Sequence, residues 1–448
     1  MSSQQPAAEV PAPQLLQVLS FWDLVVYGLC YVAPIGPWST FGFAYDLSGG
    51  LVVLVFVVGA AALSFTACSY AQMCTEVPGA GSVYAYARYS MGDAVGFLAG
   101  WMVLLDYLLI PALMYAFSAV LLAVFLPDVP KWVWVILIAA YNLGVNWFGI
   151  KTSARFNFGT LLVQFAAVAV VLATVLVVLH RTGMPQFTVD GWWKPGASFH
   201  GVFAGASLCV MSYLGFDAIS TLSAEVKPEQ RNLIGRAIIF SIVLLGALAV
   251  VNVWTLSDLS HGFQFQDPAT ATYDLLAARV SPAFSHGLTW VVTFIVAASI
   301  TPPMVTAVSR VLYAMALDGE MPRFLASLHP KYGVPHMAIL TSGALSVAVA
   351  LAFVDQVDTL TSFVNIGALS AFMAVNASVI ALYVVKRKSK QLFVHLFLPL
   401  LGVVTIAAVI TQMSPLSLEL GVSWLTLGAL VYFGRRQRAK LHVNATSS

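Results

Sequence analysis

One apolar stretch of the chain carries a carboxylate near its middle. Residues 200–225 are long and apolar enough to cross a bilayer, yet the second half contains Asp217 next to Gly215. A carboxylate at mid-depth costs roughly 2.5–3.5 kcal/mol on insertion scales, so acids in such segments are rare and mark functional sites. A glycine beside it is a place where a helix can open and free backbone groups for a ligand. The structural alternative is a helix with one polar face packed on its neighbours.

A second acid, Asp106, lies inside the apolar stretch 94–126. No Lys or Arg lies near the centre of any apolar segment, so we expect neither acid to have an internal cationic partner. Such a carboxylate must be protonated, hydrated in a cavity or neutralised by a ligand. A diamine would supply two positive charges and no negative one. The two acids therefore favour a small organic cation as the ligand.

Aromatic rings flank both acids and can attract ammonium groups through their faces. Packing within the bundle is the alternative for each ring, because 12% of the chain is aromatic. Glu225, at the end of the same stretch as Asp217, is expected to be an exit-gate acid, a proton acceptor or a helix-end charge facing water. The remaining residues predicted at the binding site are Tyr31, Gly36, Trp38, Tyr107, Tyr213, Gly215, Phe216, Ser220, Thr221 and Asn365.

The composition is that of an integral membrane protein. Of 448 residues, 60% are hydrophobic and 9% are charged, whereas soluble proteins have about 25% charged residues. The net charge of +2 is too small to suggest nucleic acid as a partner. Four unpaired cysteines and scattered histidines predict no disulfide, metal or haem site. With no nucleophile–base pair or phosphate loop, we expect neither an enzyme nor a bound cofactor.

Twelve segments are long and apolar enough to span a bilayer, which needs about 20 apolar residues. Basic residues sort 17 to one side and 4 to the other, which together make the 21 of the chain. The positive-inside rule therefore places both termini in the cytoplasm. The twelve segments are 22–45, 50–71, 94–126, 132–150, 156–179, 200–224, 234–256, 284–317, 336–354, 359–385, 394–412 and 416–434.

Two of these segments are interrupted. The first contains Pro34 and Pro37 near mid-depth, and the sixth contains the Gly215–Asp217 break. A proline inside a helix removes a hydrogen bond and clashes with the preceding turn. Interrupted helices at equivalent places, each opening a group of five, predict an inverted repeat with a site at the midplane. Two unrelated kinks are the alternative.

The predicted organisation has five parts. A disordered cytoplasmic tail, 1–20, lacks the basic and apolar regions of a signal peptide. Two five-helix repeats follow at 21–180 and 181–390. Helices 11 and 12 occupy 391–434, and a cytoplasmic tail occupies 435–448.

Three local patterns resemble the amino acid–polyamine–organocation superfamily. They are Glu76-Val-Pro-Gly-Ala-Gly-Ser-Val-Tyr84, Leu214-Gly-Phe-Asp-Ala218 and Ser309-Arg-Val-Leu-Tyr-Ala-Met-Ala-Leu-Asp-Gly-Glu-Met-Pro322. The resemblance implies an all-α, LeuT-like fold with a five-plus-five inverted repeat and two additional C-terminal helices. It agrees with the pattern of broken helices.

Within that superfamily the chain is most similar to bacterial putrescine importers. The similarity lies in Gly28–Pro34, Leu104–Leu108, Phe216–Glu225 and Phe363–Leu369. It departs from their pattern at Ala224, where those importers tend to have an acid. The resemblance implies a bacterial cell-membrane protein that imports putrescine or a related polyamine by alternating access. An amino acid permease or amino acid/amine exchanger is the alternative, and a membrane amine sensor without transport is a third.

The residues at the first break favour an amine over an amino acid as the substrate. Superfamily members that carry amino acids hold the carboxylate on free amides at this break, and Pro34 and Pro37 both lack an N–H. The coupling ion is left open between a proton, carried by one of the acids, and sodium. For sodium, Ser299 and Thr301 are the candidate ligands.

Overall fold

The computed structural model describes residues 15–77, 79–194 and 199–446, and these residues form helices and no strand. Ten helices are long and apolar enough to cross a membrane, and the bent pair α1 and α2 makes up to eleven. The predicted segment 132–150 is a helix of 17 residues, α6, at the lower limit for a spanning helix. The all-helical membrane fold is confirmed. The count of twelve stays a prediction.

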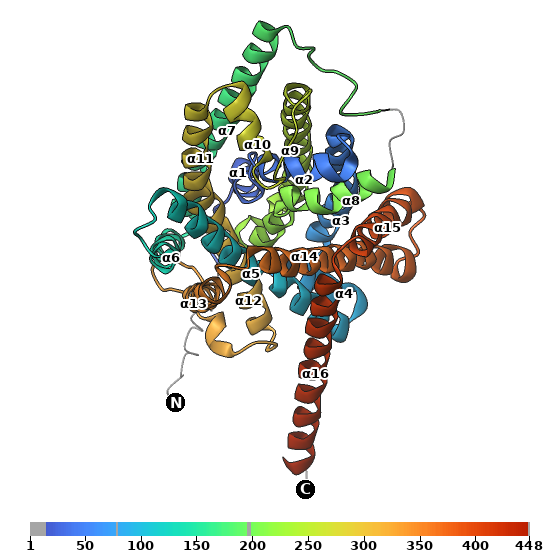
Figure 1. Cartoon of the computed structure of the whole chain (residues 1–448). Helices are drawn as coiled ribbons and strands as arrows, with labels where there is room; N and C mark the ends of the chain where they lie inside the picture. Colours follow the sequence, from blue (N-terminus) through green and yellow to red (C-terminus); the bar gives the residue numbers. More distant parts are fainter. Residues whose placement is uncertain (1–14, 78, 195–198, 447–448) are drawn as a thin grey trace.

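Most helices follow the predicted segments within a few residues, but α7 begins six residues before 156 and α16 continues twelve residues past 434, into the predicted tail (Figure 1). Two short α-helices, α4 and α10, were not predicted. The α-helices are α1 (Phe21–Val32), α2 (Pro37–Ser48), α3 (Val52–Glu76), α4 (Ser82–Met91), α5 (Asp93–Phe125), α6 (Lys131–Trp147), α7 (Ile150–Thr182), α8 (Phe199–Cys209), α9 (Asn232–Leu259), α10 (Ala271–Arg279), α11 (Pro282–Ile295), α12 (Thr301–Leu317), α13 (His336–Phe353), α14 (Val357–Val379), α15 (Leu398–Thr411) and α16 (Pro415–Thr446).

The first predicted segment is broken at its two prolines. The chain leaves the helix at Ala33, which has a φ of 63°, and α2 restarts at Pro37. Proline suits a first helical position because its missing N–H has no intrahelical partner there. The axes of α1 and α2 differ by 51°.

The sixth segment is broken at Gly215. Helix α8 continues into a short 3-10 helix, η1 (Val210–Tyr213), and Gly215 then takes a φ of 116°, which favours glycine. The chain resumes as a ten-residue 3-10 helix, η2 (Phe216–Glu225). Runs of 3-10 helix this long are uncommon and often mark hinges or strained sequence.

Equivalent helices of the two predicted repeats contact each other. The first helices meet as α1 and η2, the second as α3 and α9, the third as α5 and α12, and the fourth as α6 and α13. Mutual contacts between equivalent elements are what a pseudo-two-fold axis through the bundle produces. The unbroken helices among these pairs lie around α1 and η2, so the irregular backbone at the two breaks is buried in protein.

The eighth predicted segment, 284–317, contains a π-helical turn, η4 (Val296–Ile300), between α11 and α12. Two more π-turns, η6 (Ile380–Lys386) and η7 (Phe393–Phe397), flank the loop before α15. Single π-turns inside helices frequently lie at functional sites. The last helix, α16, runs past the bundle at the end opposite the loop that follows α7 (Figure 1).

Candidate functional site

The two helix breaks lie against each other. A Cβ built on Gly215 would overlap the ring of Tyr31, so only glycine lets that ring lie on the second break. A Cβ on Gly36 would come within 3.4 Å of the carbonyl oxygen of Ser212, in η1. The residues expected to open each helix therefore form one junction at the centre of the bundle.

Asp217 lies directly beyond this junction, in the first turn of η2, and its residue is 1% exposed. The hydroxyl of Tyr107, from α5, donates a 2.5 Å hydrogen bond to Oδ2 of Asp217. The positive end of a helix dipole also favours an anion at this position. Asp217 thus has two sources of support for a negative charge.

Asp106 precedes Tyr107 in α5 and is 3% exposed, and its Oδ1 has no hydrogen-bond partner among the described residues. Its backbone is approached closely by Gly367 of α14, where a Cβ would lie 2.7 Å from the Asp106 nitrogen. Asp106 is linked to Asp217 through its neighbour Tyr107, whose hydroxyl reaches the Asp217 carboxylate. None of the ion pairs among the described residues includes either of them.

Tyrosines gather around the two acids. The hydroxyls of Tyr31 and Tyr70 are buried without a hydrogen-bond partner among the described residues, and the Tyr31 ring lies against Gly215, two residues before Asp217. The Tyr70 ring packs edge-on against the ring of Phe216, with centroids 5.9 Å apart. Sequence reasoning missed Tyr70, because nothing in α3 separates it from the other aromatic residues. Buried hydroxyls without partners are polar groups that a ligand can satisfy.

Two of the predicted aromatic residues use their polar atoms in hydrogen bonds to neighbouring helices. The hydroxyl of Tyr213 donates to the carbonyl of Phe56 at 3.0 Å. The indole of Trp38 donates to the side chain of Asn252 at 3.4 Å. Both rings are buried beside the junction and support its walls through these bonds.

The predicted polar residues divide in the same way. Ser220 shares a 2.6 Å hydrogen bond with Ser82 of α4, and Thr221 donates to the Ala218 carbonyl in its own helix. Asn365, in α14, is buried and its Oδ1 has no partner among the described residues. Of these three, Asn365 alone keeps an unpartnered acceptor for a ligand.

Most amides of the first break are already engaged. The Ala33 amide donates to the Leu29 carbonyl in α1, the Gly36 amide donates to the Ala33 carbonyl, and Pro34 and Pro37 have no amide hydrogen. At this turn the amide of Ile35 alone has no backbone partner. The break thus offers at most one free donor to an anionic group.

Glu225 does not face water, and this corrects one of its three expected roles. It is 1% exposed, and its Oε1 accepts hydrogen bonds from Nε and Nη2 of Arg310 at 3.1 and 2.8 Å. Arg310, in α12, is equally buried. The expectation that every basic residue lies at a segment end or in a loop is therefore wrong for Arg310. The exit-gate and proton-acceptor roles of Glu225 stay predictions.

The two hydroxyls proposed as sodium ligands are hydrogen-bonded to neighbouring helices. Ser299 accepts from Gln164 at 2.7 Å, and Thr301 donates to Asn142 at 2.7 Å. In the described part of the chain, no group of three or more His, Cys, Asp or Glu side chains is placed to hold a metal ion.

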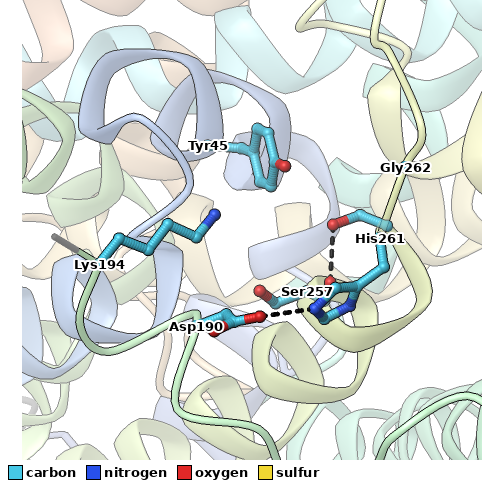
Figure 2. Close-up of a pocket in the computed structure, with 7 residues that line it drawn as sticks. Tyr45, Asp190, Lys194, Ser257, His261 and Gly262 are labelled. Atoms are coloured by element: carbon cyan, nitrogen blue, oxygen red, sulfur yellow. Dashed lines mark hydrogen bonds and ion pairs between the residues drawn. The ribbon is translucent and has the colours of Figure 1, made fainter.

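A separate polar pocket of about 110 Å³ lies between the ends of α2 and α9 and the loop that follows α7 (Figure 2). His261 lies 2.7 Å from a carboxylate oxygen of Asp190 and 2.7 Å from the Asp258 carbonyl. The Asp190 hydrogen bond raises the pKa of His261, because both acceptors favour the doubly protonated ring. The lining residues are Tyr45, Asp190, Lys194, Ser257, Ser260, His261 and Gly262.

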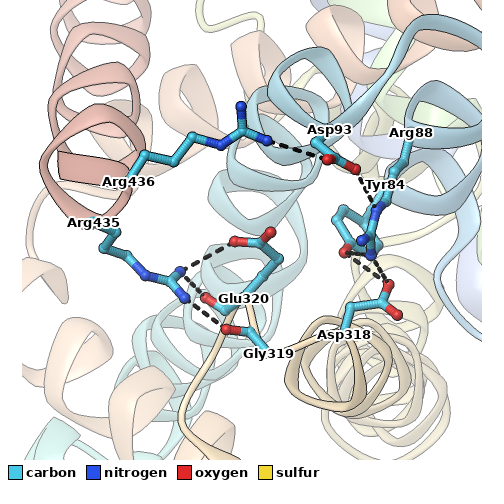
Figure 3. Close-up of polar contacts among 8 residues, drawn as sticks. All are labelled: Tyr84, Arg88, Asp93, Asp318, Gly319, Glu320, Arg435 and Arg436. Atoms are coloured by element: carbon cyan, nitrogen blue, oxygen red, sulfur yellow. Dashed lines mark hydrogen bonds and ion pairs between the residues drawn. The ribbon is translucent and has the colours of Figure 1, made fainter. Parts of the chain in front are cut away.

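Charged residues at the other end of the molecule connect α4, α5, α12 and α16 (Figure 3). Arg88 contacts Asp318 at 2.5 Å and Asp93 at 3.0 Å. Arg436 reaches the same Asp93 at 3.1 Å. Arg435 donates to the Gly319 carbonyl at 2.6 Å. Salt bridges at this exposure contribute little stability singly, but together they join both repeats to the last helix.

Comparison with known proteins identifies the family. The model of the family described as amino acid permease matches residues 23–432. The chain belongs to the amino acid permease family. It therefore has the family's LeuT-like membrane fold, and the family's members are transporters rather than enzymes.

Individual relatives of this permease differ in their substrates. It is 31% identical to the low-affinity putrescine importer PlaP of Escherichia coli, over 94% of this chain and 93% of the importer. It is 26% identical to the branched-chain amino acid permease BcaP of Bacillus subtilis, over 97% of each chain. It is 29% identical to the vacuolar cationic amino acid transporter 4 of Arabidopsis thaliana, over 82% of this chain and 64% of that one.

Proposed function

We propose that this permease imports a small organic cation, a diamine such as putrescine or a related polyamine, by alternating access. The observation that carries the proposal is the pair of buried acids, Asp106 and Asp217, beside the two helix breaks. Neither is in an ion pair among the described residues. The Escherichia coli relative is a putrescine importer, which supports the same substrate class.

The surroundings of the acids suit ammonium groups. Tyr31, Tyr70 and Phe216 present aromatic surface near them, and a cation over such a ring gains up to about 2 kcal/mol when desolvated. Buried tyrosine hydroxyls and the Asn365 amide oxygen add acceptors for the N–H groups of an amine. A diamine places one positive charge for each carboxylate.

The first break argues against a free amino acid. A carboxylate would need several backbone donors there, as anions bound at helix N-termini have, and the amide of Ile35 alone lacks a backbone partner. A cationic amino acid is the second candidate, because its side-chain charge suits the acids and three relatives are named as cationic amino acid transporters.

Transport then requires the two repeats to move against each other around the junction. With both termini in the cytoplasm, as the basic residues indicate, the membrane potential drives a dication inward by about 2.3 kcal/mol per charge per 100 mV. Asp106 is the better candidate for a coupling proton, because it lacks the hydroxyl donor and helix N-terminus that support charge on Asp217. We place the protein in the bacterial inner membrane.

Uptake of labelled putrescine into proteoliposomes that carry the purified protein tests the proposal. Unlabelled spermidine, cadaverine, arginine, glutamate and leucine serve as competitors. We expect amines alone to compete. Competition by leucine or glutamate that exceeds competition by every amine would show an amino acid permease, and putrescine binding without uptake would show a sensor.

The variant Asp217→Asn tests the site, with Asp128→Asn as its control. Asp128 is an exposed acid in the turn after α5. Removing one partner of a buried charge pair costs about 2–5 kcal/mol, so Asp217→Asn should weaken putrescine binding by roughly 30-fold or more. Asp128→Asn should bind like the wild type. Equal binding by both variants would remove Asp217 from the site.

A further inference from the structure

The ion pair between Glu225 and Arg310 is incomplete. Both side chains are 2% exposed, but Nε and Nη2 of Arg310 converge on one oxygen of the carboxylate. The other oxygen, Oε2, is buried and has no hydrogen-bond partner among the described residues. Leaving a buried charged acceptor unpaired is costly. The carboxylate thus keeps one acceptor oxygen that a second cationic or hydrogen-bonding group could satisfy.

Residues 15–19, which precede α1, pack against the Glu225–Arg310 ion pair on the predicted cytoplasmic side. The amides of Val18 and Leu19 donate to the Glu225 carbonyl at 3.0 and 3.1 Å. Leu15 packs in a small apolar cluster with Tyr313, one turn beyond Arg310. The ion pair and this segment therefore meet at the end of η2, eight residues beyond Asp217.

The distance along η2 decides how the two acids can be used. Eight residues separate Asp217 and Glu225, and a 3-10 helix rises about 2.0 Å per residue, which gives roughly 16 Å. Five single bonds of about 1.5 Å limit a four-carbon diamine to roughly 7 Å between nitrogens. One such molecule cannot bridge the two acids, so it would meet them in succession.

We propose that Glu225 is a second ammonium-binding station on the exit path, entered by exchange with Arg310. An ammonium group leaving Asp217 binds first at the free Oε2 and then displaces the Arg310 guanidinium from Oε1, which opens the path. Glu225 keeps a cationic partner throughout the exchange, and the displaced Arg310 guanidinium retains its hydrogen bond to the Ser309 hydroxyl. This inference rests on the proposed function and adds a site with its own carboxylate.

Replacing both residues of the ion pair by neutral glutamine distinguishes a role in transport from a purely structural role. Glu225→Gln alone strands the Arg310 charge, which destabilises the fold. The double variant Glu225→Gln/Arg310→Gln has no stranded charge, so its thermal unfolding midpoint should return to near the wild-type value. The matched control is Glu76→Gln/Arg387→Gln, which neutralises another Glu–Arg pair, 25% and 42% exposed.

We expect the double variant at Glu225 to bind putrescine within about twofold of the wild type. Its uptake should fall by about tenfold or more, which corresponds to about 1.4 kcal/mol. The control should match the wild type in both. Wild-type uptake by the double variant at Glu225, or a loss of uptake equalled by its loss of binding, would overturn the proposal.

If the double variant does not reach the membrane, Glu225→Asp must show the same separation between retained binding and reduced uptake, and its absence would overturn the proposal. Failure of the wild type itself to bind any amine would instead refute the proposed function.

Discussion

The contact between Gly215 and Tyr31 makes a sharp test of the junction. Gly215→Ala places a methyl group where the Tyr31 ring lies, at a φ of 116° that L side chains rarely adopt. The backbone conformation costs about 1–3 kcal/mol. Overpacking a buried ring costs about 1–3 kcal/mol more. We therefore expect a total loss of roughly 2–6 kcal/mol.

The two costs separate in a double-mutant cycle. Tyr31→Ala removes the ring that the new methyl group would strike but leaves the backbone cost. The double variant should therefore be more stable than the two single losses predict, by about 1–3 kcal/mol, the coupling typical of residues in contact. Gly183→Ala is the control, since Gly183 also has a positive φ, of 68°, but has nothing near its absent side chain.

The assay is unfolding of the detergent-solubilised protein, followed by putrescine binding to the fraction that stays folded. Gly215→Ala should reduce both stability and affinity, and Gly183→Ala should reduce stability slightly without changing affinity. Strict additivity of Gly215→Ala and Tyr31→Ala would show that the ring does not lie on the break, and the junction would be wrong.

Three further perturbations probe other contacts. Tyr107→Phe removes a hydrogen bond to a charged acceptor worth about 1.5–3 kcal/mol, so putrescine affinity should change by at least about tenfold while a diamine stays preferred; an unchanged affinity would place the hydroxyl outside the site. Gly367→Ala should push on the α5 backbone and reduce uptake more than it reduces expression, because its Cβ would lie 2.7 Å from a backbone nitrogen; normal uptake would contradict that packing. At pH values below 6.5, His261→Gln should have a lower thermal unfolding midpoint than the wild type, because there the wild-type His261 ring is protonated in both the folded and the unfolded protein. That difference should vanish as pH rises through the raised pKa of His261, because the ring loses its charge beside Asp190; a difference that grows with pH would reverse the sign of this argument.

The sequence predicts which residues lie at the central site, because acids in apolar segments are rare. That rarity alone selected Asp106 and Asp217, and the structure brings them together with Tyr107. Prolines and a glycine likewise predicted both breaks, since the backbone preferences of these residue types are known from the sequence alone. The structure adds that these two breaks touch, which no local pattern could state.

Other features depend on distant pairing and escaped prediction. The sorting of basic residues by membrane side gives no sign that Arg310 is buried in an ion pair, because its partner Glu225 lies 85 positions away in the sequence. Tyr70 was one aromatic residue among many until its ring was found against Phe216. The 3-10 form of η2 also had no signal, because hydrogen-bond register is set by packing against α1 and α9.

Contacts at both ends of η2 tie this helix to the first segment of the chain. The Tyr31 ring covers its start at Gly215, and the amides of Val18 and Leu19 bind its end at Glu225. A motion that opens the bundle must therefore carry α1 and η2 together against α5 and α12. Among the described residues, side-chain hydrogen bonds cross that boundary at three places, from Tyr27 to the Pro303 carbonyl, from Tyr107 to Asp217 and from Arg310 to Glu225. The last two end on carboxylates for which an ammonium group can compete, so under the proposed function the substrate itself can release two of the three contacts.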